Sequence, residues 1–178
     1  MKADIIWSKS IDIELFEKSI YHSMPMRKKH IAIEILPRAV WFLEAVGLYL
    51  VHHFASQPPE LSNNVVIIVI GIFLVITGTI YAVWALRFLA RPMITKELVT
   101  DGPYRFSRHP MYVAIYIVLI GIGLLFFSQL WFLVLLIFIP IWYFICKLEE
   151  DHMENLHSSR YLTYKQKTHM FLPRIMNN

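Results

Sequence analysis

The sequence predicts an all-α integral membrane protein, a small bundle of about four transmembrane helices whose last two form a tight hairpin. Of its 178 residues, 57% are hydrophobic, whereas soluble domains contain about 45–50% apolar residues. The excess lies in long runs without charged residues, as membrane-spanning helices require. The single cysteine, Cys146, excludes an internal disulfide and a cysteine-ligated metal site, and no metal is expected.

Residues 1–36 are expected to form a cytoplasmic or interfacial segment ahead of one transmembrane domain, residues 37–178. Isolated apolar residues in this segment are spaced like one face of a helix lying on the membrane surface. The basic cluster 27–30 is expected to anchor the following span at the cytoplasmic side. The segment lacks the apolar core of a cleavable signal peptide.

The expected spans are about 38–55, 65–87, 111–128 and 130–147. Glu44 interrupts the first, and an acid at this depth is expected to face the bundle, either in a structural pair or in contact with a ligand. Gly71 and Gly78 in the second span are seven residues apart and therefore share a face, where they allow close helix packing. Gly121 and Gly123 have the same expected role in the third span.

The basic residues predict the orientation of these spans. Seven of the 17 Lys and Arg residues fall in 1–38, five in 87–108 and five in 147–178. The loops 56–64 and 128–129 contain none, so both termini are expected on the cytoplasmic side of a prokaryotic inner membrane or endoplasmic reticulum. In the cytoplasmic tail 148–178, Tyr161 and Tyr164 are expected to anchor at the membrane interface, with contact to a cofactor as the alternative.

The last two spans meet at Ser128-Gln129, a join short enough to require a tight hairpin. His109 lies about nineteen residues before this turn, and Glu149 and Glu150 lie about as far behind it. Antiparallel helices of equal rise place such groups at the same membrane depth. The hairpin is therefore expected to bring cations and acids together at the cytoplasmic rim, and an ion-paired collar is the simplest interpretation.

A short polar stretch, 100–112, leads into the third span. It opens with a Gly-Pro turn after Asp101. Ser107 is expected to cap the following helix, with Pro110 in its first turn. The positive end of a helix that begins at a membrane surface suits an anion.

Residues 98–112 read L-V-T-D-G-P-Y-R-F-S-R-H-P-M-Y. This stretch resembles the signature L-V-T-x-G-P-Y-x-x-x-R-H-P-x-Y of the isoprenylcysteine carboxyl methyltransferase and phospholipid methyltransferase superfamily. The tail of the chain offers Glu149-Glu150, Leu156, Tyr161, Tyr164 and Leu172-Pro173. These resemble the E-E…F-G-x-x-Y-x-x-Y…P ending of the same superfamily, and the resemblance covers about residues 65–175.

The resemblance implies a membrane methyltransferase that binds S-adenosyl-L-methionine in a cytoplasmic pocket, without a Rossmann domain. The sequence contains no G-x-G-x-x-G motif, which agrees with the absence of a Rossmann domain. The cofactor-binding residues carried over by position are Lys96, Glu97, Leu98, Val99, Tyr104, His109, Pro110, Met111, Tyr112, Glu149 and Glu150. The catalytic residues expected from it are Arg108, His109 and Glu150.

Physical chemistry assigns roles to these groups. The methionine carboxylate of the cofactor suits the helix start and Arg108. Its ammonium and sulfonium suit Glu149 and Glu150, with tyrosine faces adding cation–π attraction. An amine or thiol acceptor must lose a proton, which His109 or a glutamate can take.

The sequence departs from the superfamily in three places. Lys96 stands where a histidine is usual, and Ala114 where a glycine is common. The substrate arginine of prenylcysteine methyltransferases is missing, since Ile145 and Cys146 occupy its candidate positions and Lys147 is the nearest cation.

The identity of the acceptor therefore stays open. The first hypothesis is an isoprenylcysteine carboxyl methyltransferase-like enzyme acting on a prenylated or lipid-linked molecule. The alternatives are a phospholipid ethanolamine N-methyltransferase, an enzyme for a lipophilic thiol, and a non-catalytic four-helix scaffold or lipid-binding protein. The membrane is the expected partner in each case, and no nucleic acid is expected.

The orientation is testable with reporters. A reporter inserted at residue 60 is expected outside the membrane and one at the C-terminus inside, because the loop 56–64 has no basic residue. The reverse result would place the predicted pocket on the side without cofactor.

Overall fold

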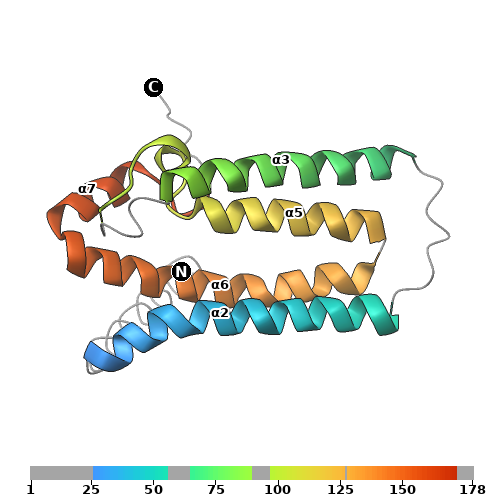
Figure 1. Cartoon of the computed structure of the whole chain (residues 1–178), viewed down its shortest axis with the longest axis horizontal. Coiled ribbons are helices and arrows are strands. Elements are labelled where there is room, and N and C mark those ends of the chain that lie inside the picture. Colours follow the sequence, from blue (N-terminus) through green and yellow to red (C-terminus); the bar gives the residue numbers. More distant parts are fainter. Residues whose placement is uncertain (1–25, 56–64, 90–96, 127, 172–178) are drawn as a thin grey trace, which may run out of the picture.

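The computed structural model describes residues 26–55, 65–89, 97–126 and 128–171, and every regular element in these ranges is helical. In chain order the elements are α2 (Met26–Leu50), the π-helix η1 (Val51–Ala55), α3 (Val65–Leu89), the 3-10 turn η2 (Gly102–Arg105), α5 (Pro110–Phe126), α6 (Gln129–His157) and α7 (Ser159–Lys167). Four long helices lie side by side, with α3 next to α5 and α6 next to α2 (Figure 1). The predicted class, a small helical membrane bundle, is confirmed.

Three helical stretches are long and apolar enough to cross a membrane: Glu34–Phe54, Val65–Leu89 and Gln129–His157. The remaining predicted span, 111–128, corresponds to α5, which has 17 residues. At about 1.5 Å per residue this helix is roughly 26 Å long, at the lower limit for crossing the hydrocarbon.

Two helices extend beyond the predicted spans. α2 begins at Met26 and continues through Pro37, so its start lies inside the predicted N-terminal segment 1–36, of which residues 1–25 lie outside the described ranges. α6 continues past residue 147 as far as His157, because its polar continuation contains no helix breaker. The helix ends where Ser158 adopts a positive φ of 47°. The start of the predicted tail is therefore helical.

Glycines bring α3 and α5 into backbone contact, as predicted. A methyl group on Gly121 would lie 2.8 Å from the carbonyl oxygen of Gly71, and one on Gly78 would lie 3.0 Å from the carbonyl oxygen of Ala114. These separations are shorter than carbon–oxygen van der Waals contact, so only glycine permits this spacing of the helices.

Tryptophan side chains fill the space between α5 and α6. Gly123 faces Trp131, whose Nε1 donates a hydrogen bond to the carbonyl oxygen of Leu119 at 2.9 Å. Ser128 caps α6 by accepting a hydrogen bond from the Trp131 amide. The hairpin connection is as short as the sequence predicts.

Glu44 joins three helices from inside the bundle. Its side chain is fully buried. One carboxylate oxygen accepts a hydrogen bond from Tyr116 Oη at 3.1 Å, and the other accepts one from Trp142 Nε1 at 2.7 Å. The prediction that this acid faces the bundle is confirmed, and of its two interpretations the structure favours the structural pair.

The glycine packing predicts a contrast between two equivalent substitutions. Gly78→Ala is expected to lower the free energy of unfolding by about 1–3 kcal/mol, because the new methyl group meets Val118 at 2.8 Å and backbone atoms at 3.0 Å. Gly47→Ala is the control, since its methyl group meets only Val134 at 3.5 Å. Thermal unfolding in detergent measures both, and equal stability of the two variants would contradict the packing described.

Candidate functional site

The start of α5 meets the polar end of α6, as the hairpin geometry predicts. Arg108 Nε lies 2.8 Å from Glu150 Oε1. The imidazole of His109 lies between two acids, with Nδ1 3.5 Å from Glu149 Oε2 and Nε2 3.4 Å from Glu150 Oε1. Tyr112 Oη donates a hydrogen bond to Glu149 Oε1 at 2.6 Å. Residues about forty positions apart in sequence thus form one cluster, which we call the acid–imidazole cluster.

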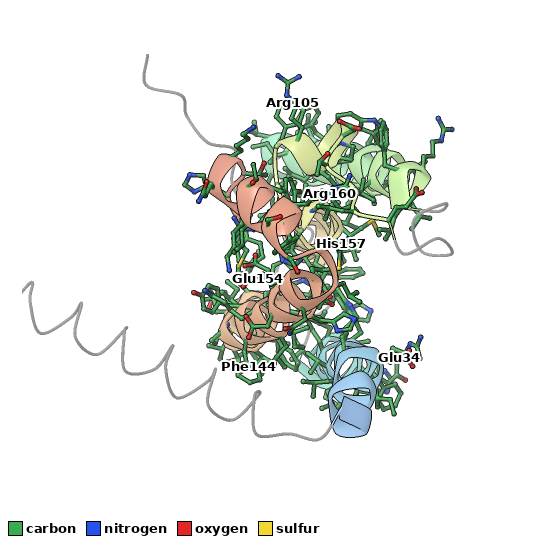
Figure 2. The ribbon with its side chains drawn as sticks, turned by 90° about the vertical axis from the view of Figure 1, so that its left-hand side faces the viewer. Glu34, Arg105, Phe144, Glu154, His157 and Arg160 are labelled. Atoms are coloured by element: carbon green, nitrogen blue, oxygen red, sulfur yellow. The ribbon has the colours of Figure 1, made fainter. Side chains whose placement is uncertain are left out.

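The cluster lies at the end of the bundle that also carries α7 and η2 (Figure 1). Figure 2 looks onto this end and shows α6 between α2 on one side and the η2 segment on the other. Glu154 and His157, which are labelled there, belong to the last turns of α6 beyond the apolar part of the helix. The cluster therefore lies where the hydrophobic bundle gives way to polar residues.

Arg108 holds this end of the protein together. Besides its contact with Glu150, its Nη1 donates hydrogen bonds to the carbonyl oxygens of Lys165, at 3.2 Å, and of Thr168. The guanidinium thereby connects the start of α5, α6 and the chain that follows α7. This structural role comes in addition to any contact with a ligand.

The backbone at the start of α5 is occupied by the chain itself. The amides of Arg108 and His109 donate to the carbonyl oxygens of His169 and Met170 at 3.0 and 3.1 Å. Ser107 Oγ donates to Met170 O at 2.9 Å and accepts from the His109 amide at 3.2 Å. Ser107 therefore closes the turn before α5, and the prediction that it caps the helix is wrong. These two amides are also not open to an anion in this structure, contrary to the expected helix mouth.

Two tyrosines of α7 contribute to the core. Tyr161 and Tyr164 are 3% and 7% exposed, and their rings contact each other. Tyr164 Oη donates to the carbonyl oxygen of Tyr104 at 2.6 Å. The prediction that this pair anchors at the membrane interface is therefore wrong, because α7 folds back onto η2 and buries them. Burial raises the pKa of Tyr104 to about 12, and the charge of Glu149 adds to the shift.

The surroundings of His109 favour its protonated form. Burial on its own lowers the pKa of an imidazole. Contacts with the Cys146 thiol and with the carboxylates of Glu149 and Glu150 outweigh burial and raise the pKa of His109 well above its usual value. We expect the imidazolium to be the main form at neutral pH.

The structure places the predicted site residues in three groups. Those that meet at this end are Tyr104, Arg108, His109, Pro110, Met111, Tyr112, Glu149 and Glu150. Glu97 is exposed, and Leu98 and Val99 are half-buried in an irregular stretch that leads into η2. Lys96 lies outside the described residues.

Sequence reasoning missed one aromatic residue of the site. Trp41 of α2 lies parallel to the ring of Tyr112 with 6.2 Å between centroids, and 4.2 Å from the ring of Trp142. A signal was present, since Trp41 precedes the buried Glu44 by three residues and so shares its helix face. Trp41, Tyr112 and Trp142 therefore form an aromatic wall beside the acid–imidazole cluster.

Comparisons with known proteins cover this region. A family model described as phospholipid methyltransferase matches residues 64–160, which include both halves of the cluster. The nickel-cobalt-cadmium resistance protein NccN of Alcaligenes xylosoxydans xylosoxydans is 27% identical over 120 residues, which make up 67% of this chain and 56% of that protein. The chain thus spans little more than half the length of this relative. No solved structure matches the chain.

His109 is expected to make stability depend on pH. The pKa of His109 is higher in the folded than in the unfolded protein. Its contribution to the free energy of unfolding is therefore complete below its unfolded pKa of about 6.5 and is lost as the pH rises through its folded pKa. The unfolding midpoint of the wild type in detergent should therefore fall as the pH rises above about 6.5. The unfolding midpoint of His109→Gln should fall less over the same pH range. The midpoint of His53→Gln, a substitution at an exposed position, should fall as much as that of the wild type. If the unfolding midpoint of His109→Gln depended on pH as strongly as that of the wild type, the raised pKa of His109 would be contradicted.

Proposed function

Because the chain belongs to the phospholipid methyltransferase family, we propose that it transfers a methyl group from S-adenosyl-L-methionine to a lipid-linked acceptor at the cytoplasmic face of a membrane. The observation that carries the proposal is the acid–imidazole cluster. It joins the two motifs of the superfamily through contacts of 2.6 to 3.5 Å at the polar end of an apolar bundle. An ion-paired collar requires opposite charges, but not two carboxylates around one buried imidazole.

The residues present fit the proposed cofactor. S-adenosyl-L-methionine supplies an activated methyl group on a sulfonium, together with an ammonium and a carboxylate. Glu149 is the better partner for the two cations, because its side chain is 27% exposed whereas Glu150 is fully buried and bound to Arg108. Tyr112 and Trp41 present aromatic surfaces beside Glu149. Such surfaces attract cations and can stack on an adenine ring.

The cluster supports an amine as the acceptor. Methyl transfer is a displacement at carbon, so the protein contributes mainly by aligning the acceptor. An ammonium group must lose its proton before its nitrogen can attack. Glu149 is the partly exposed acid of the cluster, and a carboxylate at this position can both orient an ammonium and accept its proton. We therefore favour the ethanolamine amine of a phospholipid.

A prenylcysteine carboxylate is the second candidate, which the motif resemblance favours. Such an acceptor needs no base, only a cation that orients it. Ile145 and Cys146, at the candidate positions of the substrate arginine, are both buried. Arg108 is bound to Glu150, and Arg105 is exposed and points away from the cluster (Figure 2). The arginines at this end thus support a carboxylate less well than the cluster supports an amine.

The name of the curated relative concerns resistance to metals. In ranges 26–55, 65–89, 97–126 and 128–171, no group of three His, Cys, Asp or Glu side chains is arranged to hold a metal ion. A metal function is therefore not part of the proposal.

The cofactor assignment predicts a specific loss of binding. Purified protein in nanodiscs is expected to bind S-adenosylhomocysteine in a calorimetric titration. Glu149→Gln should weaken that binding roughly 10- to 100-fold, because a hydrogen bond to a charged group contributes about 1.5–3 kcal/mol. Asp101→Asn is the matched control, since this carboxylate is exposed and makes no capping hydrogen bond.

The outcomes separate the candidate functions. Wild-type protein that does not bind S-adenosylhomocysteine would contradict the enzyme and favour a lipid-binding scaffold. If binding is present, labelled methyl donor is supplied with phosphatidylethanolamine or with farnesylcysteine. Label on the amine headgroup supports the first candidate, and label on the farnesylcysteine ester supports the second.

A further inference from the structure

Glu44 is a fully buried acid inside the bundle that the proposed reaction does not use. It lies on α2, in a stretch that is long and apolar enough to cross a membrane. Burying an acid at such a depth is costly, so its oxygens require hydrogen-bond donors. An apolar side chain at this position would avoid that cost, but it would not orient the polar groups of its neighbours.

The hydrogen bond to Glu44 fixes the orientation of the Trp142 indole. Trp142 Nε1 donates to Glu44 Oε2 at 2.7 Å, and Trp142 is only 3% exposed. An indole has a single polar hydrogen, so one acceptor inside the bundle determines which edge of the ring faces α2. Without that acceptor, the N–H would be left unpaired or the ring would turn towards another acceptor.

Trp142 is the central member of the aromatic wall. The centre of its ring lies 4.2 Å from that of Trp41 and 5.0 Å from that of Tyr112. Trp41 and Tyr112 are farther from each other, with 6.2 Å between their centres. Trp142 thus contacts both other rings more closely than they contact one another, and a rotation of its indole would displace both.

Tyr112 connects the aromatic wall to the acid–imidazole cluster. Its ring packs against Trp142, and its hydroxyl donates to Glu149 Oε1 at 2.6 Å. Trp142 and Glu149 are seven positions apart on α6, which places them two turns apart on one face of the helix. A displaced Tyr112 ring would lengthen its hydrogen bond to Glu149, the acid that the proposed function assigns to the cofactor cations.

We propose that Glu44 is a positioning residue for the proposed methyl-transfer site. Its carboxylate holds the indole of Trp142, and the indole supports the ring of Tyr112. Tyr112 in turn holds the side chain of Glu149. Glu44 does not touch the cofactor or the acceptor in this assignment, which rests on the proposed function because it concerns the geometry of that site.

Two substitutions of Glu44 separate its hydrogen bonds from its charge. In Glu44→Gln, the amide oxygen can accept from Trp142 and the amide nitrogen can donate to Tyr116 Oη. The hydroxyl of Tyr116 then has the carbonyl oxygen of Leu135, at 3.4 Å, as its acceptor. Glu44→Leu accepts neither hydrogen bond. Both variants lose the carboxylate, so a difference between them reports the hydrogen bonds.

Fluorine NMR and calorimetry test the proposal on full-length protein in nanodiscs. Fluorotyrosine replaces tyrosine, and the signal of Tyr112 is assigned from its absence in Tyr112→Phe. Glu44→Leu should shift this signal and weaken S-adenosylhomocysteine binding roughly three- to tenfold, as expected when aromatic contacts with a ligand are lost. Glu44→Gln should retain the wild-type signal and affinity.

Leu48→Ala is the matched control for stability. Leu48 is buried one turn beyond Glu44 on the same helix, and it packs with Trp131 and Leu135 instead of with the aromatic wall. The cavity left by Leu48→Ala should lower the unfolding midpoint. The Tyr112 signal and the affinity for S-adenosylhomocysteine should stay at their wild-type values.

Two results would overturn the assignment. The first is a lower unfolding midpoint in Glu44→Leu with an unchanged Tyr112 signal and affinity, since Glu44 would then stabilise the bundle without positioning the site. The second is an equal loss in Glu44→Gln, because the charge and not the hydrogen bonds would then be responsible.

Two further cases keep the test decisive. If Glu44→Leu does not fold, Trp142→Phe replaces it, since this variant keeps an aromatic ring without the N–H. It should shift the Tyr112 signal in the same way, and an unchanged signal would overturn the assignment. If the wild type does not bind S-adenosylhomocysteine, the proposed function fails. The Tyr112 signal then decides separately whether Glu44 positions the aromatic wall.

Discussion

The contact between Arg108 and Glu150 is the interaction on which the polar end of this protein depends. Glu150 is fully buried, and an ionised acid at that position requires a close cation. Loss of one partner of a buried ion pair typically costs about 3–5 kcal/mol, because the other charge is left unpaired. The same guanidinium holds the carbonyl oxygens that follow α7, so one side chain fixes α5, α6 and the end of the described chain. His109 is positioned next to Glu150 as a result.

Much of this arrangement could be predicted from the sequence because it follows from helix geometry. A short turn between two apolar runs forces residues at equal distances from it to the same depth, which is why His109 meets Glu149 and Glu150. Glycines spaced along one face likewise indicate close approach of two helices, and Gly78 and Gly121 lie at such contacts. In each case the spacing of residues along one chain segment determines the contact.

The remaining features depend on contacts between segments whose relative position no local pattern specifies. Tyr161 and Tyr164 share a helix face, and that spacing suits burial as well as it suits an interface. Their burial follows from the way α7 folds back onto η2, which also delivers the carbonyl oxygens of His169 and Met170 to the start of α5. A backbone carbonyl leaves no signature in the sequence, so the occupied helix mouth could not have been predicted.

The two sides of α6 suggest how one small bundle separates cofactor chemistry from acceptor choice. The superfamily motifs supply His109 and Glu149, which lie beside the aromatic wall and which the proposed function assigns to the acceptor. Tyr143 and Lys147 lie outside those motifs, at the membrane-facing edge of the same helix. Substitutions there can change which headgroup is held without disturbing the buried contacts of Glu150, whereas substitutions within the motifs disturb both. If the chain is the methyltransferase proposed above, we expect acceptor specificity to be more readily altered at the exposed edge of α6 than in the motifs that mark the family.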